Sequence, residues 1–138
     1  MKKEFYIKNE GKMKEFAKKV AKNLSKNSCL ALFGDFGSGK TFFTKYICKY
    51  LQCNQPVTSP SFVIMNHYTG NLDVFHFDLY RLNSDQQLQD IYFQECFGKG
   101  VVIIEWAEIV KNILPKNSTF FYFFYHPDGG RSVLVENF

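Results

Sequence analysis

The sequence is poor in arginine and lacks the cysteine patterns typical of metal or redox sites. Arg81 and Arg131 are its only arginines, whereas fifteen of the seventeen basic residues are lysine. The four cysteines form no Cys-x-x-Cys pair and no cluster with histidine at zinc-like spacing. We therefore expect no structural zinc site, and we expect the thiols to be reduced and buried.

Long apolar runs are also missing. No segment approaches the roughly 18 consecutive apolar residues of a membrane-spanning helix. The N-terminal segment MKKEFYIKNEGK lacks the apolar stretch of about 7–15 residues that defines a signal peptide. These absences predict a cytoplasmic protein that does not associate with membranes.

The length and charge of the chain predict one small domain with a basic N-terminal segment. Its 138 residues, 46% of them hydrophobic, fit a single domain over residues 1–138 and exclude a large lid or second domain. Residues 1–28 hold nine lysines and three glutamates, a net charge of +6, within a total of +4. A solvated helix face is the simpler interpretation of these lysines, and a docking surface for RNA or an acidic partner is the alternative.

The hydrophobic pattern predicts an α/β fold. We expect strands at 4–8, 29–33, 62–68, 72–78, 101–105, 119–125 and 131–136, and helices at 11–25, 40–51, 84–96 and 107–113. The continuous apolar runs CLALF and VVIIE are typical of buried parallel strands. Asn9 can cap the first helix, and Ser84 with Gln87 forms a capping box for the third. The pattern predicts a single domain with a central, mostly parallel sheet, flanking helices and appended antiparallel hairpins.

The most specific motif is Gly34-Asp35-Phe36-Gly37-Ser38-Gly39-Lys40-Thr41, a full match to GxxxxGK[ST] between an apolar strand and a helix. Glycines let the backbone curl so that its N–H groups surround a phosphate, and the following helix N-terminus favours the same anion. Lys40 can reach β- and γ-phosphate oxygens, and the Thr41 hydroxyl can ligate Mg²⁺. The motif predicts a P-loop that binds a nucleotide phosphate.

Carboxylates at two strand ends are candidates for the rest of the site. Glu105 closes VVIIE, as in a Walker B element, and can hold Mg²⁺ directly or through water. Asp78 closes VFHFD and can orient the attacking water or bind the metal; a capping or salt-bridged role is the alternative for both carboxylates. The loop with Thr58 and Ser59 is a candidate γ-phosphate sensor or an ordinary turn.

Other aromatic and imidazole side chains receive simpler interpretations. The three histidines show no ligand spacing, so we expect structural roles for them. Aromatic residues alternate along 119–125, which favours packing in the core or on the sheet over base stacking. Trp106 follows the candidate metal ligand Glu105 and is expected to line the site.

The rest of the sequence narrows the kind of P-loop protein that this chain can be. The sequence has neither an Asn-Lys-x-Asp guanine reader nor a DxxG switch, so guanine specificity is not expected. A small kinase of a nucleoside or metabolite remains the alternative, although two arginines provide little for an arginine-bearing lid. A minimal ATPase that borrows residues from a partner fits better.

Four motifs in order, GDFGSGKT, VTSPSF, HFDLYRL and VVIIEWAE, resemble the TsaE (YjeE) family over nearly the whole chain. The resemblance implies a weak, Mg²⁺-dependent ATPase with a P-loop NTPase-like fold, monomeric when isolated. It would act with TsaD and TsaB in forming threonylcarbamoyladenosine (t6A) in tRNA, and it would meet tRNA indirectly through that complex. The threonylcarbamoyl transfer itself would belong to TsaD.

The resemblance also implies roles for individual residues. Thr41 and Glu105 would hold Mg²⁺, Asp78 would support hydrolysis, and Thr58 and Ser59 would sense the γ-phosphate. The residues implied at the nucleotide are Asn9, Glu10, Asp35, Phe36, Gly37, Ser38, Gly39, Lys40, Thr41, Phe42, Trp106 and Arg131. Arg81 would lie at the partner surface or form an internal salt bridge.

Overall fold

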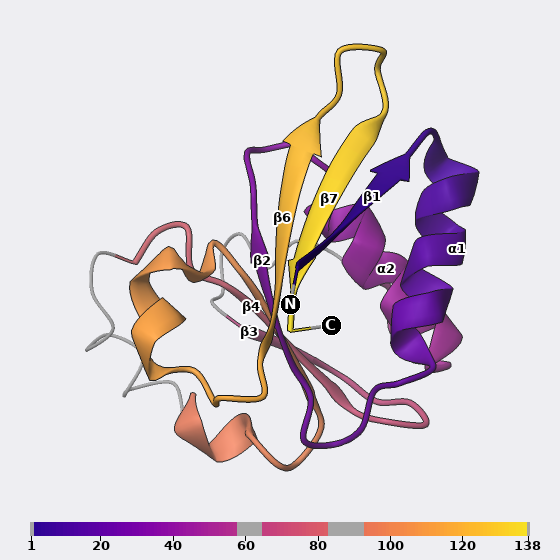
Figure 1. Ribbon diagram of the computed structural model, residues 1–138. Helices are drawn as coiled ribbons and strands as arrows, with labels where there is room; N and C mark the ends of the chain where they lie inside the picture. Colours follow the sequence, from indigo (N-terminus) through magenta and orange to yellow (C-terminus); the bar gives the residue numbers. More distant parts are fainter. Residues whose placement is uncertain (1, 58–64, 83–92, 138) are drawn as a thin grey trace.

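The computed structural model describes residues 2–57, 65–82 and 93–137. These residues form a seven-stranded sheet with the order β1-β7-β6-β2-β5-β4-β3 (Figure 1). The strands are β1 (Lys2–Ile7), β2 (Cys29–Phe33), β3 (Met65–Tyr68), β4 (Val74–Asp78), β5 (Val101–Glu105), β6 (Thr119–Tyr125) and β7 (Arg131–Glu136). The predicted α/β class is confirmed.

Parallel strands make up the centre of the sheet, and antiparallel hairpins make up its edges. Strand β2 pairs in parallel with β5 and β6, and β5 pairs in parallel with β4. The hairpins β3–β4 and β6–β7 are antiparallel, and β1 adds to the outer side of β7. The carboxyl ends of β2, β4 and β5 therefore meet at one edge, which carries Gly34, Asp78 and Glu105.

Helix α1 (Glu10–Ala21) begins one residue before the predicted start at residue 11 and ends one turn early. The Asn9 side chain accepts a hydrogen bond from the Lys12 backbone N–H at 3.0 Å, which confirms the predicted cap. The predicted end at residue 25 is wrong, because the chain leaves the helix in tight turns and Ser25 N–H donates to Ser28 Oγ at 2.9 Å. Asn and Ser side chains of this kind compete with helical backbone bonds.

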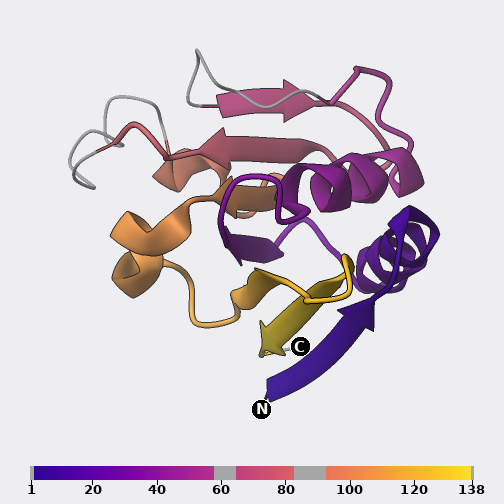
Figure 2. The ribbon, with the colours of Figure 1, turned by 90° about the horizontal axis from the view of Figure 1, so that it is seen from above.

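The two sheet faces are covered by different helices. Helix α1 and helix α2 (Lys40–Tyr50) lie side by side on one face, and the 3₁₀ helices η2 (Gln94–Cys96) and η3 (Ala107–Ile113) lie on the other (Figures 1 and 2). The predicted short helix at 107–113 has the expected bounds but is 3₁₀. Of the predicted helix at 84–96, residues 84–92 lie outside the described residues, and 94–96 are the 3₁₀ turn.

Strand alternation divides the core between these two faces. Leu30 and Leu32 of β2 pack in the cluster beneath α1 and α2, whereas Ala31 and Phe33 pack in the cluster beneath η3. Phe121 is completely buried, and its ring centroid lies 5.0 Å from that of Phe43, so the aromatic alternation of β6 serves packing as predicted. In the described part of the chain no helix is long and apolar enough to cross a bilayer.

The cysteine prediction needs one correction. Cys29, Cys48 and Cys96 are free and buried, but Cys53 is only half-buried. Burial raises the pKa of the Cys29 thiol to about 11, which keeps it protonated and unreactive at neutral pH.

Gly34, where β2 ends and the P-loop begins, has no room for a side chain. It has φ of +143°, and a Cβ there would lie 2.7 Å from the Phe123 carbonyl oxygen. We expect Gly34→Ala to lower the free energy of unfolding by about 3 kcal/mol, since it combines backbone strain with overpacking. Urea unfolding measures this loss. Gly129→Ala is the control: φ is +94° with nothing within 4 Å, so about 1 kcal/mol of strain alone is expected. Equal losses would contradict the steric argument.

Candidate functional site

The loop between β2 and α2 is shaped to leave backbone N–H groups free for an anion. Gly37 has φ of +72° and Gly39 has φ of +115°, a region that glycine adopts readily. Gly39 is the N-cap of α2, and no side chain hydrogen-bonds the helix start there. The first N–H groups of α2 thus remain available where the helix dipole favours negative charge.

Lys40, the first residue of α2, is held inside this loop. Its side chain is 4% exposed, and Nζ donates to the Gly34 carbonyl oxygen at 2.5 Å. Nζ also lies 3.8 Å from the centroid of the Trp106 ring. Burial lowers the pKa of Lys40, and the nearby carboxylates, Glu105 foremost, partly oppose this shift. A bound phosphate would add the negative charge that a buried ammonium favours.

Glu105 is a buried carboxylate held from two sides. The Thr41 hydroxyl lies 3.4 Å from Oε1, and His76 Nε2 lies 2.5 Å from Oε2. His76 is completely buried and Glu105 is 3% exposed, so solvent does not compete for this hydrogen bond. His76, for which the sequence predicted a structural role, is therefore a direct hydrogen-bond partner of the proposed metal ligand Glu105.

Asp78 lies beside Glu105 in the sheet. The two residues are partners in the parallel β4–β5 register, and Asp78 Oδ1 accepts a hydrogen bond from the Tyr80 backbone N–H at 3.0 Å. Thr41, Asp78 and Glu105 supply hard oxygen donors, which suit Mg²⁺. No group of three or more His, Cys, Asp or Glu side chains in the described residues is arranged to hold a metal. Magnesium sites commonly need only one or two carboxylates with substrate phosphates, so the donor set fits that ion.

The structure brings most of the predicted residues into one cleft. A cavity of about 200 Å³ is lined by Phe36, Gly37, Gly39, Lys40, Thr41, Phe42, Asp78, Glu105 and Trp106. Every residue in this set was expected at the nucleotide, at the metal or in hydrolysis. The P-loop and the strand-end carboxylates therefore face the same space.

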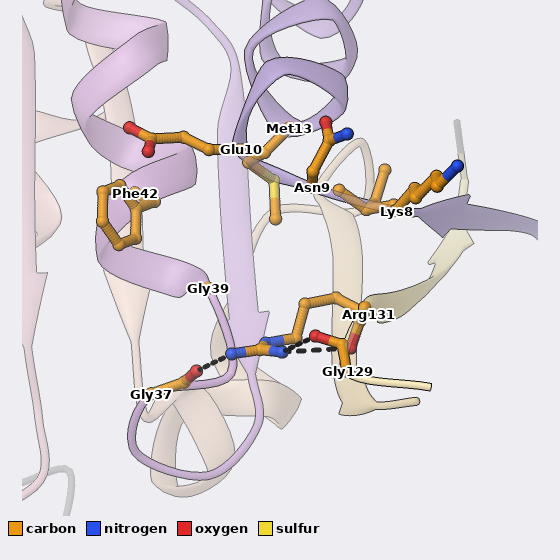
Figure 3. A pocket seen from close by; sticks show the side chains of 11 residues that line it. Lys8, Asn9, Glu10, Met13, Gly37, Gly39, Phe42, Gly129 and Arg131 are labelled. Atoms are coloured by element: carbon orange, nitrogen blue, oxygen red, sulfur yellow. Dashed lines mark hydrogen bonds between the residues drawn. The ribbon is translucent and has the colours of Figure 1, made fainter. Parts of the chain in front are cut away.

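Figure 3 shows the residues that line a second cavity of about 250 Å³. This cavity adjoins the first at Gly37, Gly39 and Phe42, which line both. It contains the predicted Asn9, Glu10 and Arg131, together with Ile7, Lys8, Met13, Gly129 and Gly130. Its walls come from the β1–α1 junction, α2 and the β6–β7 turn. We refer to these two adjoining cavities, which share three lining residues, as the cleft.

Arg131 is fixed in this second cavity by the backbone. Its guanidinium donates to the Gly37 carbonyl oxygen at 3.1 Å and to those of Gly129 and Gly130 at 3.0 Å each (Figure 3). The guanidinium also lies 4.6 Å from the centroid of the Tyr125 ring. The Tyr125 hydroxyl donates to the Phe36 carbonyl oxygen. Strand β6 and strand β7 thus hold the P-loop from outside.

A few predicted residues are not brought to the cleft. Thr58 and Ser59 lie outside the described residues. Asp35 is exposed, and its Oδ1 accepts from the Phe36 backbone N–H at 2.9 Å. Ser38 is 1% exposed but lines neither cavity, and its hydroxyl has no hydrogen-bond partner among the described residues.

From the sequence we expected only a structural role for His76 and a packing role for Tyr125, and Glu108 was not among the predicted residues. The HFD spacing held the signal for His76, because residues i and i+2 share one sheet face and His76 lies diagonal to Glu105 across β4–β5. Tyr125 and Glu108 carried no comparable signal. Burial raises the pKa of Glu108, and the charge of Lys40 opposes that shift.

Three aromatic side chains gather at the mouth of the cleft. Phe36, Tyr80 and Trp106 contact one another with ring centroids 4.8–5.0 Å apart. Phe36 is 58% exposed and Tyr80 is 54% exposed. Trp106 has φ of +56°, a strained conformation for a side chain of this size. The protein thus keeps apolar surface exposed beside its buried lysine.

Comparison with known proteins shows to which family the chain belongs. The family described as "Threonylcarbamoyl adenosine biosynthesis protein TsaE" matches residues 7–133. The chain belongs to the TsaE family. The match extends from the end of β1 into β7 and so includes both cavities of the cleft.

Individual TsaE relatives agree with the family match. The chain is 39% identical over 111 residues to the "tRNA threonylcarbamoyladenosine biosynthesis protein TsaE" of Rickettsia felis, covering 78% of this chain and 64% of that protein. The Rickettsia typhi protein of the same name is 38% identical, with 78% and 76% covered. The crystal structure of Bacillus subtilis YdiB has a TM-score of 0.80 and 29% identity, covering 98% of this chain and 84% of that one.

Proposed function

We propose that this protein is a Mg²⁺-dependent ATPase that serves t6A formation in tRNA together with TsaD and TsaB. The observation that carries the proposal is the meeting of Lys40, Thr41 and Glu105 at the start of α2. The glycine-rich loop, a buried cation and hard oxygen donors line one cavity there, and this combination supports phosphate binding. Membership of the TsaE family supplies the biological process.

The cleft supports a division of labour along a bound ATP. The P-loop N–H groups and Lys40 would bind the β- and γ-phosphate oxygens, so the ammonium would exchange its Gly34 carbonyl contact for phosphate. The second cavity, with Asn9, Glu10 and Arg131, would receive the nucleoside end. When bound, Mg²⁺ would neutralise charge on the phosphates, held by Thr41 and Glu105 with Asp78 nearby.

Hydrolysis needs a water positioned in line with the γ-phosphate. Asp78 is half-buried at the end of β4 and lines the same cavity as Lys40, so we assign it the positioning of that water. Glu105 is held by His76 and Thr41, which would keep its carboxylate in place during hydrolysis. The products are ADP and phosphate, and no group remains on the protein.

Action with TsaD and TsaB fits the exposed rings at the mouth of the cleft. Phe36 and Tyr80 present aromatic surface beside the phosphate loop, where a partner could cover it and exclude water. An isolated chain leaves this side open, which would account for the weak hydrolysis that the family resemblance implies. The partner assignment itself follows the family resemblance.

Phosphate release from ATP, measured with and without added TsaB and TsaD, tests the proposal. We expect release to rise with the partners and to fall about a hundredfold or more in Glu105→Gln, since this change removes a preorganised charge without changing shape. Binding of ATP should change by only a few fold. Glu95→Gln, an exposed carboxylate outside the cleft, is the matched control. Phosphate transfer to an added nucleoside, with no effect of partners, would instead support a small kinase.

A further inference from the structure

The outer surface of α1 and α2 carries a second, basic site that the ATPase cleft does not use. A hollow of about 260 Å³ lies between the two helices and is lined by Lys14, Lys18, Tyr46, Lys49 and Tyr50. Both helices cover the same sheet face and leave this side to solvent (Figures 1 and 2). We call these five residues the α1–α2 groove.

The groove combines two kinds of group at regular spacing. Lys14 and Lys18 are four residues apart, so they lie one turn apart on the same face of α1. Tyr46 and Tyr50 have the same spacing on α2, and Lys49 lies beside them. The α1 wall thus presents two ammonium groups one turn apart, and the α2 wall presents two phenol rings with the Lys49 ammonium beside them. Tyr46 is half-buried against the core, whereas Tyr50 is 38% exposed.

Negative charge in the groove is nearly absent. Its five lining residues include no carboxylate, and α2 has none along its length. Glu15 of α1 is paired with Lys12 at 3.2 Å, and Glu10 accepts a hydrogen bond from the Tyr46 hydroxyl at 2.5 Å. Among the described residues, none of Lys14, Lys18 and Lys49 forms a salt bridge. Their charges are available to an external polyanion.

We infer that the α1–α2 groove binds single-stranded RNA. Ammonium groups repeated along one wall match the repeated phosphates of a strand, and phenol rings one turn apart offer stacking surfaces for its bases. An acidic peptide would use the lysines and leave the rings without a role. The names of its TsaE relatives refer to a modification of tRNA, and this favours RNA over other polyanions as the occupant.

The groove also has a structural link to the proposed ATP cleft. Glu10 lines the second cavity of the cleft and accepts the hydrogen bond from Tyr46, which lines the groove. RNA on the groove would therefore lie next to the nucleoside end of the cleft. The inference itself does not require ATP hydrolysis.

Fluorescence anisotropy with a labelled 12-nucleotide single-stranded RNA tests this inference between 50 and 200 mM KCl. Three lysine–phosphate contacts predict a slope of about −2 for the logarithm of the affinity against the logarithm of the salt concentration. The triple change Lys14→Gln, Lys18→Gln and Lys49→Gln should lower affinity at least tenfold at 50 mM and bring the slope near zero. The control triple Lys26→Gln, Lys99→Gln and Lys116→Gln removes equal charge from exposed sites elsewhere and should stay within twofold.

The tyrosine wall separates RNA from an acidic protein partner. Tyr50→Leu removes one stacking ring and should lower RNA affinity about tenfold without changing the salt slope. Polyglutamate of equal length should compete weakly. Strong competition by polyglutamate with no effect of Tyr50→Leu would overturn the inference in favour of an acidic protein, and absence of RNA binding at 50 mM KCl would overturn it outright.

Two further measurements keep this inference distinct from the proposed function. The groove triple variant should bind ATP as the unchanged protein does, because its lysines line neither cavity of the cleft. Lys40→Ala should keep RNA binding. If the protein hydrolyses ATP but does not bind RNA, only the inference about the groove is overturned. If it binds RNA but does not hydrolyse ATP, only the proposed ATPase function is overturned.

Discussion

Replacing Lys40 with Met should weaken ATP binding about a hundredfold or more and abolish phosphate release. The substitution keeps a long, flexible side chain and removes its charge. In the proposed complex the ammonium makes charge-assisted hydrogen bonds to β- and γ-phosphate oxygens, each worth about 1.5–3 kcal/mol. Isothermal titration calorimetry with ATP and Mg²⁺ measures the loss.

Lys40→Arg sharpens this prediction because it keeps the charge and changes the shape. The Lys40 side chain is 4% exposed, with Trp106 on one side and the Gly34 carbonyl on the other. A planar guanidinium needs more room than an ammonium, so Lys40→Arg should also bind ATP poorly. Lys116→Met, at an exposed position away from the cleft, should bind normally. ATP affinity of Lys40→Met within threefold of the unchanged protein would contradict the proposed phosphate role.

Local patterns in the sequence predicted the frame that holds this lysine. The run CLALF and the run VVIIE could be recognised as buried parallel strands because both faces of a central strand need apolar residues. The GxxxxGKT motif predicted the turn between β2 and α2, because its glycines permit the backbone conformation of the loop and its Lys40 begins the helix. Strand ends that carry Asp78 and Glu105 then had to meet at one edge of a parallel sheet.

The rest of the cleft depends on contacts between distant segments, which no local pattern contains. Arg131 reaches Gly37 because β7 pairs with β1 and β6 in a register that places Ile7 opposite Arg131. Glu10 contacts Tyr46 because α1 and α2 pack against each other. Pairing partners of this kind are set by tertiary packing and not by periodicity, so the second cavity followed only from the family resemblance.

The histidine prediction shows the limit of reasoning by ligand spacing. His67, His76 and His126 share the same lack of a metal motif, yet the structure places them in different environments. His67 pairs with Asp73 where both side chains are substantially exposed, whereas the His76–Glu105 pair is buried. The two pairs therefore differ in burial. Whether a polar side chain of a strand is buried depends on the residues that pack around it in the sheet, and ligand spacing does not reveal this.

Replacing His76 with Phe should therefore destabilise the protein by about 3–5 kcal/mol, because Glu105 would remain buried without its partner. At this chain length, the midpoint of thermal unfolding should fall by roughly 10–20 °C. His67→Phe is the matched control: it breaks an exposed histidine–aspartate pair and retains an aromatic ring beside Phe75, so it should cost less than about 1 kcal/mol. Differential scanning calorimetry of both variants compares the two pairs directly.

A double-mutant cycle separates loss of the pair from loss of packing. His76→Phe combined with Glu105→Leu removes both polar groups, so much of the stability lost in His76→Phe should return. Activity should not return, because Glu105 is the proposed metal ligand.

His76→Gln offers a second test, because its amide can still donate a hydrogen bond to Glu105. This variant should keep most of its ATP affinity. It should lower kcat by a larger factor than it raises KM, because the carboxylate shifts. If His76→Phe and His67→Phe cost the same stability, the buried contact has no special role and Glu105 is positioned by Thr41 and the strand alone.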